Sequence, residues 1–135
     1  FGLFANSALI MNILIIIFLG GGSGAISRYV LINFINQFFS LTMPYGTIVV
    51  NLIGAFLIGS LYCFISSKIL MNEQIKIFLI TGFLGGFTTF SSFNLDFYNL
   101  IDSGRYSCAI IYAGISFIGT IVLFYLGYSL IKIII

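Results

Sequence analysis

The chain has 135 residues, of which 61% are hydrophobic and only 6% are charged, and its net charge is +2 at pH 7. A mean hydropathy of +1.23 excludes an ordinary soluble globular domain, and the small net charge gives no reason to expect nucleic acid as a partner. Histidine is absent, and Cys63 and Cys108 lie far apart in apolar segments. We therefore expect no cluster of metal-ligating side chains and no enzyme.

Four apolar segments are long enough to cross a membrane as helices, since each crossing needs roughly 20 apolar residues. The segments cover residues 8–38, 45–67, 75–100 and 106–133. Short connections join them, and nothing is left over for a soluble domain. The sequence therefore predicts an all-α membrane protein in which residues 1–135 form one transmembrane domain of four helices.

Positive charge is distributed too evenly to orient these four spans. Lys68, Lys76 and Lys132 fall on the side that holds both termini, while Arg105 and Arg28 fall toward the other side. Such a weak difference permits insertion in both directions. Because four helices form a thin bundle whose polar residues need a partner surface, we expect an oligomer, and the weak charge difference permits an antiparallel, dual-topology dimer of identical chains.

The third span carries the most informative motif, Thr81-Gly-Phe-Leu-Gly-Gly-Phe-Thr-Thr-Phe-Ser-Ser-Phe93. Its glycines and threonines weaken helical propensity in the middle of an apolar segment. A broken helix at membrane depth is tolerated only where it is buried in protein or lines a polar cavity. We therefore predict a break in the third helix and an ion-handling site at that break. The residues expected to break the helix are Gly82, Gly85, Gly86, Thr88 and Thr89.

A row of phenylalanines runs through this motif at steps of 4, 3, 3 and 4 residues, which would place the rings on one helical face. The row consists of Phe83, Phe87, Phe90, Phe93 and Phe97. Such a row is ordinarily core or lipid contact. Here the hydroxyls of Ser91 and Ser92 interleave it, and ring edges carry partial positive charge. The row could therefore hold a small anion against the ring edges.

Polar residues in the other spans each allow two interpretations. The Asn51 amide, expensive in lipid unless bonded, either bonds to another helix or donates into a pore. Arg28 either reaches the membrane interface or lines a vestibule that attracts anions. Tyr112, Ser116 and Thr120 are four residues apart and form a possible hydroxyl track, although each hydroxyl could instead bond to the carbonyl one turn earlier.

Small residues predict two close contacts between helices. Gly20 and Gly24 are one turn apart in the first span, and Ala55 and Gly59 are one turn apart in the second. Small residues at this spacing let two helix backbones approach closely. We therefore expect one face of each of these helices to pack tightly against a neighbour.

In this order, the motifs resemble the Fluc family of fluoride channels, also called the CrcB family. The similarity runs from about Leu19 to Lys132 and is most specific in the third span. The supporting motifs are the glycine-rich turn with Arg28-Tyr29, Gly46-Thr47 with Asn51-Leu-Ile-Gly54, and Tyr112 with Ser116 and Gly119. The family often has threonine where Ser92 stands and glutamate where Asp96 stands, which are minor departures.

The resemblance implies a fluoride-selective channel that exports cytoplasmic fluoride passively through two pores of an antiparallel dimer. It implies a structural sodium ion at the dimer centre, held by the backbone carbonyls of Gly85 and Thr88, and places Arg28 near an aqueous vestibule. The implied partners are fluoride, the lipid of a plasma membrane, such as a bacterial inner membrane, and a second copy or a paralogous chain. The implied pore residues are Asn51, Phe90, Ser91, Phe93, Tyr112, Ser116 and Thr120.

The main alternative is a small proton-coupled multidrug exporter, which also has four spans and an antiparallel arrangement. Such a transporter needs an acid buried in the membrane to exchange protons with a cationic substrate. The sequence places Glu73, Asp96 and Asp102 at or near the ends of the spans, which disfavours this alternative. A purely structural membrane subunit is a third possibility, but packing alone does not require a broken helix.

Overall fold

The computed structural model describes residues 2–39, 42–67 and 71–135, with side chains from residue 7 onward. Within these ranges the chain is helical and contains no strand. The helices are α1 (Gly2–Asn36), α2 (Tyr45–Ser66), α3 (Glu73–Lys76), the π-helix η1 (Ile77–Leu84), α4 (Gly85–Phe87), α5 (Phe90–Asp102) and α6 (Tyr106–Ile134).

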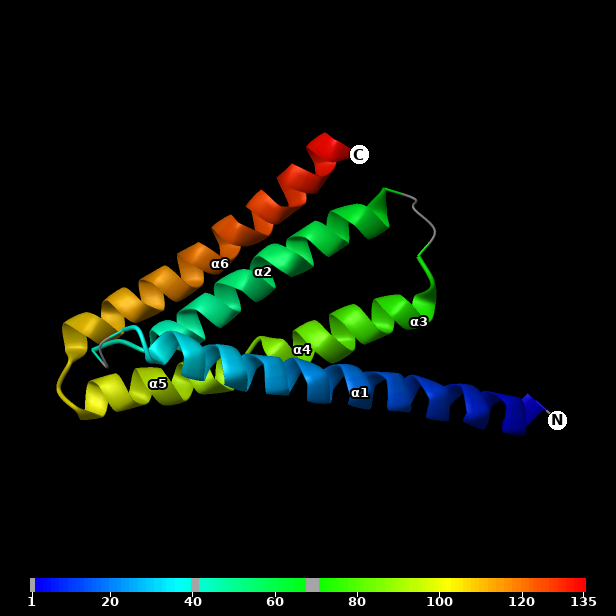
Figure 1. Ribbon diagram of the computed structural model, residues 1–135, viewed down its shortest axis with the longest axis horizontal. Helices are drawn as coiled ribbons and strands as arrows, with labels where there is room; N and C mark the ends of the chain where they lie inside the picture. Colours follow the sequence, from blue (N-terminus) through cyan, green and yellow to red (C-terminus); the bar gives the residue numbers. More distant parts are fainter. Residues whose placement is uncertain (1, 40–41, 68–70) are drawn as a thin grey trace.

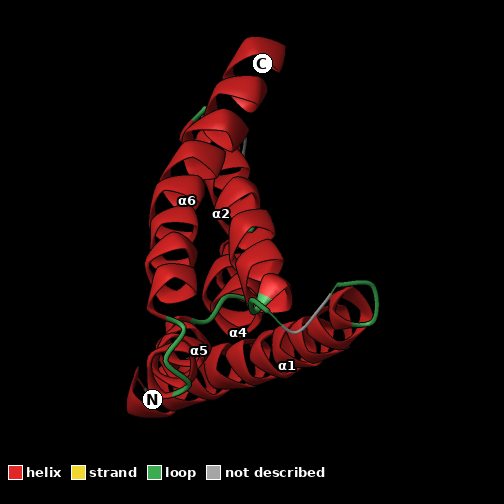
Figure 2. Ribbon diagram, turned by 90° about the vertical axis from the view of Figure 1, so that its left-hand side faces the viewer, coloured by secondary structure: helices red, strands yellow, loops and turns green. Residues whose placement is uncertain are grey.

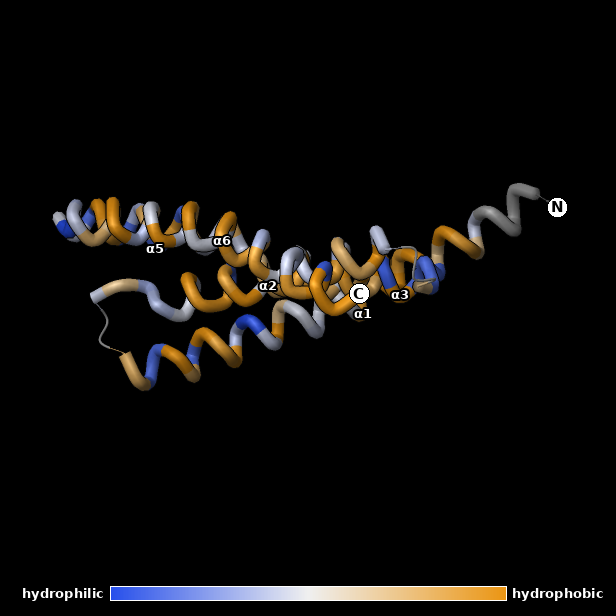
Figure 3. The backbone as a smooth tube through the Cα atoms, turned by 90° about the horizontal axis from the view of Figure 1, so that it is seen from above, coloured by the Kyte–Doolittle hydropathy of each residue, from blue (hydrophilic) through white to orange (hydrophobic). Residues whose placement is uncertain are grey.

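Four helical stretches are long and apolar enough to cross a membrane, as the sequence predicts. They are Ser7–Asn36, Tyr45–Ser66, Glu73–Asp102 and Tyr106–Ile134. Figure 3 shows apolar residues along most of each long helix and hydrophilic residues gathered mainly toward helix ends. The third stretch is composite, because it contains α3, η1, α4 and α5 in succession.

The helices pack as two main pairs. Helix α2 lies along α6, and α1 lies along η1 and α4 (Figure 1). Figure 2 shows α2 and α6 standing side by side, with α1 crossing near their lower ends. The break between α4 and α5 lies where these two pairs meet, so residues from α1, α2 and α6 surround it.

Glycines set the contact between α1 and the third span. A Cβ atom at Gly20 would lie 2.7 Å from the carbonyl oxygen of Phe78 and 2.9 Å from the Cα atom of Gly82. A Cβ atom at Gly24 would collide with the carbonyl oxygen of Phe83. The two backbones therefore touch directly, which confirms the close contact predicted for Gly20 and Gly24.

Helices α2 and α6 touch in the same way. A Cβ atom at Gly59 would collide with the carbonyl oxygen of Phe124, and one at Gly127 would collide with the carbonyl oxygen of Phe56. The prediction of a tight contact at Gly59 is therefore confirmed. Its predicted companion, Ala55, lines a pocket instead.

The third helix is interrupted, but at the threonines and not at the glycines. Gly82 lies within η1, and Gly85 and Gly86 lie within α4. The chain becomes extended at Thr88, with φ −79° and ψ 153°, and at Thr89, with φ −152° and ψ 116°. The predicted break is therefore confirmed at Thr88 and Thr89 and is wrong for the three glycines. Close contacts of Gly82 and Gly86 with α1 keep that part helical, although glycine is a weaker helix former than threonine. The chain leaves the helix at the two β-branched threonines, where these glycine contacts end.

The interruption also divides the row of phenylalanines into two groups. Phe83 stacks on Phe87 before the break, with ring centroids 5.8 Å apart. Phe90 stacks on Phe93 after it, at 5.3 Å, and Phe93 on Phe97, at 6.2 Å. A single helical face along the whole row is therefore wrong, because the extended threonines redirect the chain between the two groups.

Helix ends differ from the sequence-based ranges for local reasons. Helix α1 ends at Asn36 and not at Phe38, since the next residues turn with bonds to carbonyls three positions back. The third span begins at Glu73, two residues early, because Asn72 caps it: its side-chain oxygen accepts a hydrogen bond from the Gln74 N–H at 2.8 Å. Gly104, with φ +73°, closes α5 and lets α6 begin.

We expect Gly24→Ala to destabilise the protein by about 1–3 kcal/mol, because the added methyl group meets backbone atoms that cannot move aside. Gly22→Ala is the matched control: a Cβ atom there meets nothing within 4 Å. It should leave stability unchanged or raise it by up to about 1 kcal/mol through helix propensity. Thermal unfolding of the purified protein in detergent measures both. Equal stability of the two variants would contradict the packing described above.

Candidate functional site at the helix break

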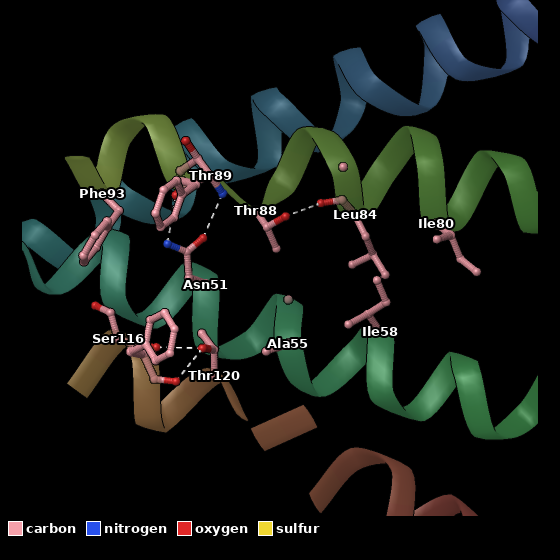
Figure 4. Close-up of a pocket in the computed structure, with 14 residues that line it drawn as sticks. Asn51, Ala55, Ile58, Ile80, Leu84, Thr88, Thr89, Phe93, Ser116 and Thr120 are labelled. Atoms are coloured by element: carbon pink, nitrogen blue, oxygen red, sulfur yellow. Dashed lines mark hydrogen bonds between the residues drawn. The ribbon is translucent and has the colours of Figure 1, made fainter. Parts of the chain in front are cut away.

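A pocket of about 380 Å³ lies beside the break, between α2, η1, the start of α5, and α6. Figure 4 shows Asn51 and Thr89 meeting at one end of it, with Ser116 and Thr120 approaching from α6. Of the predicted site residues, it is lined by Asn51, Gly85, Thr88, Phe90, Phe93, Ser116 and Thr120. The structure thus brings most of the predicted set together, while Arg28, Ser91 and Tyr112 lie outside the pocket lining.

Asn51 binds both backbone groups of one residue at the break. Its Nδ2 donates to the carbonyl oxygen of Thr89 at 3.1 Å, and its Oδ1 accepts from the Thr89 N–H at 2.8 Å (Figure 4). The helix-to-helix bond that the sequence allowed is therefore present. Because an amide nitrogen carries two hydrogens, one N–H of Asn51 remains beyond this pair of bonds, and the residue also lines the pocket.

Thr89 organises the first turn of α5. Its Oγ1 accepts a hydrogen bond from the Ser92 N–H at 3.1 Å, which caps the helix. The same oxygen lies 3.1 Å from the hydroxyl of Ser91 and 3.0 Å from that of Ser92. The Ser91 hydroxyl is therefore bonded to the capping residue Thr89, and Ser91 does not line the pocket.

Arg28 lies at the break as well. Its Nη1 donates to the carbonyl oxygen of Thr88 at 3.4 Å. The hydroxyl of Thr88 donates to the carbonyl oxygen of Leu84 at 2.8 Å, so the Thr88 side chain is occupied within its own helix. The guanidinium therefore contacts the backbone of the broken helix directly, and the two interpretations of Arg28 stay predictions.

Two stacked rings form the aromatic wall of the pocket. Phe90 and Phe93 stack with an angle of 21° between their planes, and Phe93 stacks on Tyr112 at 5.0 Å. Stacking covers ring faces and leaves ring edges, which carry the partial positive charge, at the sides. The side chain of Phe90 is 68% exposed in the single chain, so one side of this wall is open.

The hydroxyls of α6 do not behave alike. Ser116 is 8% exposed, and its Oγ makes no hydrogen bond to any residue that the structure describes. Thr120 donates to the carbonyl oxygen of Ser116 at 2.7 Å, which is the alternative that the sequence left open for these hydroxyls. Tyr112 donates instead to Asp96. Buried hydroxyls are normally bonded, so Ser116 differs from Tyr112 and Thr120 in having no partner among the described residues.

The sequence-based interpretation missed a polar group built around Asp96. The hydroxyl of Thr47 donates to Asp96 Oδ2 at 2.6 Å, and that of Tyr112 donates to the same oxygen at 3.3 Å. Asp96 lies near the end of the third stretch, as its position suggested, but it is half-buried within α5. Helical spacing was the available signal, because Thr47 lies one turn before Asn51 and Asp96 lies three residues after Phe93.

A cation at this break would have to use backbone oxygens. Among the residues that the structure describes, no group of three or more histidine, cysteine, aspartate or glutamate side chains could hold a metal ion. The carbonyl of Thr88 points out of the helical hydrogen-bond ladder, since its residue is extended. Carbonyl oxygens suit hard cations, so the donor chemistry fits an alkali metal ion.

Fold and site together define a multi-pass membrane protein with an interrupted helix and a pocket of neutral donors. The sequence model described as "CrcB-like protein, Camphor Resistance (CrcB)" matches residues 15–128. The chain therefore belongs to the CrcB family, and this family consists of ion channels and not enzymes.

Several relatives carry the name "Fluoride-specific ion channel FluC". The one from Chloroflexus aurantiacus (strain ATCC 29366 / DSM 635 / J-10-fl) is 38% identical over 120 residues, which cover 89% of this chain and 95% of the relative. Those from Hydrogenobaculum sp. (strain Y04AAS1) and Coxiella burnetii (strain CbuK_Q154) are 46% and 43% identical over 76% and 73% of this chain, and 82% and 80% of their own lengths.

We expect Thr47→Val to destabilise the protein by about 1–3 kcal/mol, since it removes the shorter hydrogen bond to a half-buried carboxylate. Thr47→Ser keeps the hydroxyl and should retain most of the stability. Thermal unfolding in detergent compares the two variants with the parent. If valine and serine at this position gave the same melting temperature, the bond to Asp96 would contribute nothing.

Proposed function

We propose that this chain is a fluoride-selective channel that exports cytoplasmic fluoride by passive permeation. The observation that carries the proposal is the pocket at the break, where the unbonded Ser116 hydroxyl, the Asn51 amide and the stacked rings of Phe90 and Phe93 meet. The names of the relatives support the choice of fluoride among anions.

The pocket chemistry suits a small, strongly hydrated anion. Such an ion can leave water only if other donors replace its hydration shell, and it can leave the pore only if each site binds weakly. The Ser116 hydroxyl, the remaining N–H of Asn51 and the ring edges are neutral donors of this kind. The hydroxyls of Ser91, Tyr112 and Thr120 would join the path by exchanging their present partners for the anion.

A second chain is needed to complete such a pore. Phe90 is 68% exposed beside the pocket, and the polar groups of Asn51 and Ser116 in the pocket lining would be costly if they opened to hydrocarbon. An antiparallel copy, or a paralogous chain, would cover this side and repeat the site. Two pores per dimer follow from the two-fold relation, and Arg28, close to the break, would draw anions toward them. The setting would be a plasma membrane, such as a bacterial inner membrane.

We further propose a structural sodium ion at the centre of this dimer, held by the carbonyls of Gly85 and Thr88. Arg28 takes one lone pair of the Thr88 carbonyl oxygen, and a carbonyl has two, so one remains for a cation. Two chains together would supply about four such oxygens to one cation. A monovalent ion fits better than a divalent one, because divalent ions favour carboxylates.

Fluoride efflux from liposomes that contain the purified protein tests the proposal. We expect fluoride to leave down its gradient without a proton gradient, while chloride is retained, because chloride is larger and fits the donors poorly. Empty liposomes serve as the control. Proton-driven transport of a cationic drug without fluoride efflux would favour the multidrug exporter instead, with Asp96 as its acid. Equal chloride flux would overturn fluoride selectivity.

Replacing Phe90 or Phe93 with isoleucine should lower fluoride efflux about tenfold or more, equivalent to at least ~1.4 kcal/mol in barrier height. Isoleucine keeps apolar bulk but removes the ring edge. Phe18→Ile is the matched control, because Phe18 is 77% exposed on α1 and does not line the pocket. Size-exclusion chromatography checks that assembly survives. Parental flux in both pocket variants would mean that these rings do not touch the ion.

A further inference from the structure

We infer that Asn51 is a positioning residue for the cation site, so that the cation site and the anion pocket depend on one side chain. The inference rests on the sodium ion proposed above. It goes further, because it assigns Asn51 a task that is separate from donating to fluoride.

The hydrogen-bond ladder of the broken helix carries the argument. In a continuous α-helix the N–H of Thr89 would bond to the carbonyl of Gly85, four residues earlier. Here that N–H donates to Asn51 Oδ1 at 2.8 Å. Asn51 thus removes the donor that would occupy the Gly85 carbonyl, one of the two proposed cation ligands.

The amide nitrogen of Asn51 binds a carbonyl at the break as well. Asn51 Nδ2 donates to the Thr89 oxygen at 3.1 Å. This oxygen is therefore occupied, and the neighbouring Thr88 carbonyl, held on one side by Arg28, is left as the second proposed ligand. The Ser92 N–H, which would occupy the Thr88 carbonyl in a continuous helix, donates to Thr89 Oγ1 instead. Asn51 therefore holds both backbone groups of the residue whose side chain draws away that second donor.

The fit between α2 and the break keeps this amide in place. Gly54, one turn after Asn51, is so close to Thr88 that a Cβ atom there would collide with the Thr88 methyl group. Asparagine supplies a donor and an acceptor at fixed separation, as a peptide unit does in a strand pair. Leucine has similar bulk but neither group, and serine is too short to reach both.

A sodium titration of the melting temperature tests the inference. Sodium would be exchanged for N-methyl-D-glucamine at constant ionic strength, with the purified parent, Asn51→Leu and Ser116→Ala in detergent. We expect sodium to raise the parent's melting temperature, and Asn51→Leu to raise the sodium concentration at half-maximal effect about tenfold or more. Ser116→Ala should lower fluoride flux and leave that midpoint unchanged, because its hydroxyl does not touch the break.

The outcomes separate this inference from the proposed function. A lower melting temperature in Asn51→Leu with an unchanged sodium midpoint would overturn the inference, since it would show a merely structural role. If the parent ignored sodium, both the sodium ion and the inference would fail, while liposome efflux would still decide the fluoride channel. Should Asn51→Leu not fold, Asn51→Ser, which loses reach and not polarity, decides by the same midpoint.

Discussion

The constraint on which the rest of this structure depends is the need to pair backbone groups where water is absent. Two extended residues, Thr88 and Thr89, interrupt a helix inside a membrane-spanning stretch. Each unpaired N–H or C=O there would be costly. Asn51 pairs both groups of Thr89, and Arg28 contacts the carbonyl of Thr88. Both polar side chains are therefore used on the backbone.

The glycine contacts follow from the same constraint. Arg28 reaches the break because α1 lies directly against the third span, and it lies there because Gly20 and Gly24 carry no side chain. Asn51 reaches the break because Gly54 lets α2 approach Thr88. In both helices, a glycine that lets the backbones approach lies about one turn from the polar residue, Arg28 or Asn51, that then reaches the break. A substitution at a glycine would therefore disturb the site as well as the packing.

Sequence reasoning worked where one physical signal dominated and failed where two competed. The four spans were predictable because hydropathy over about 20 residues has no rival signal. The break was predictable, and the two threonines that form it were among the residues expected there. Propensity also favoured the three glycines of the motif, but packing on α1 keeps Gly82 and Gly86 helical. The partners of Asp96 required knowing which helix faces meet, and one sequence does not contain that information.

The nearby charged side chains are bonded away from the pocket, which bears on the anion site proposed above. Asp96 accepts hydrogen bonds from the hydroxyls of Thr47 and Tyr112 and does not line the pocket. Its carboxylate is therefore bonded to these two hydroxyls and does not face the cavity. Arg28 is likewise bonded to a carbonyl and lies outside the pocket lining. The groups left to face the cavity are neutral. A full positive charge inside it would trap an anion, whereas hydroxyl, amide and ring-edge donors bind weakly enough to let it move on.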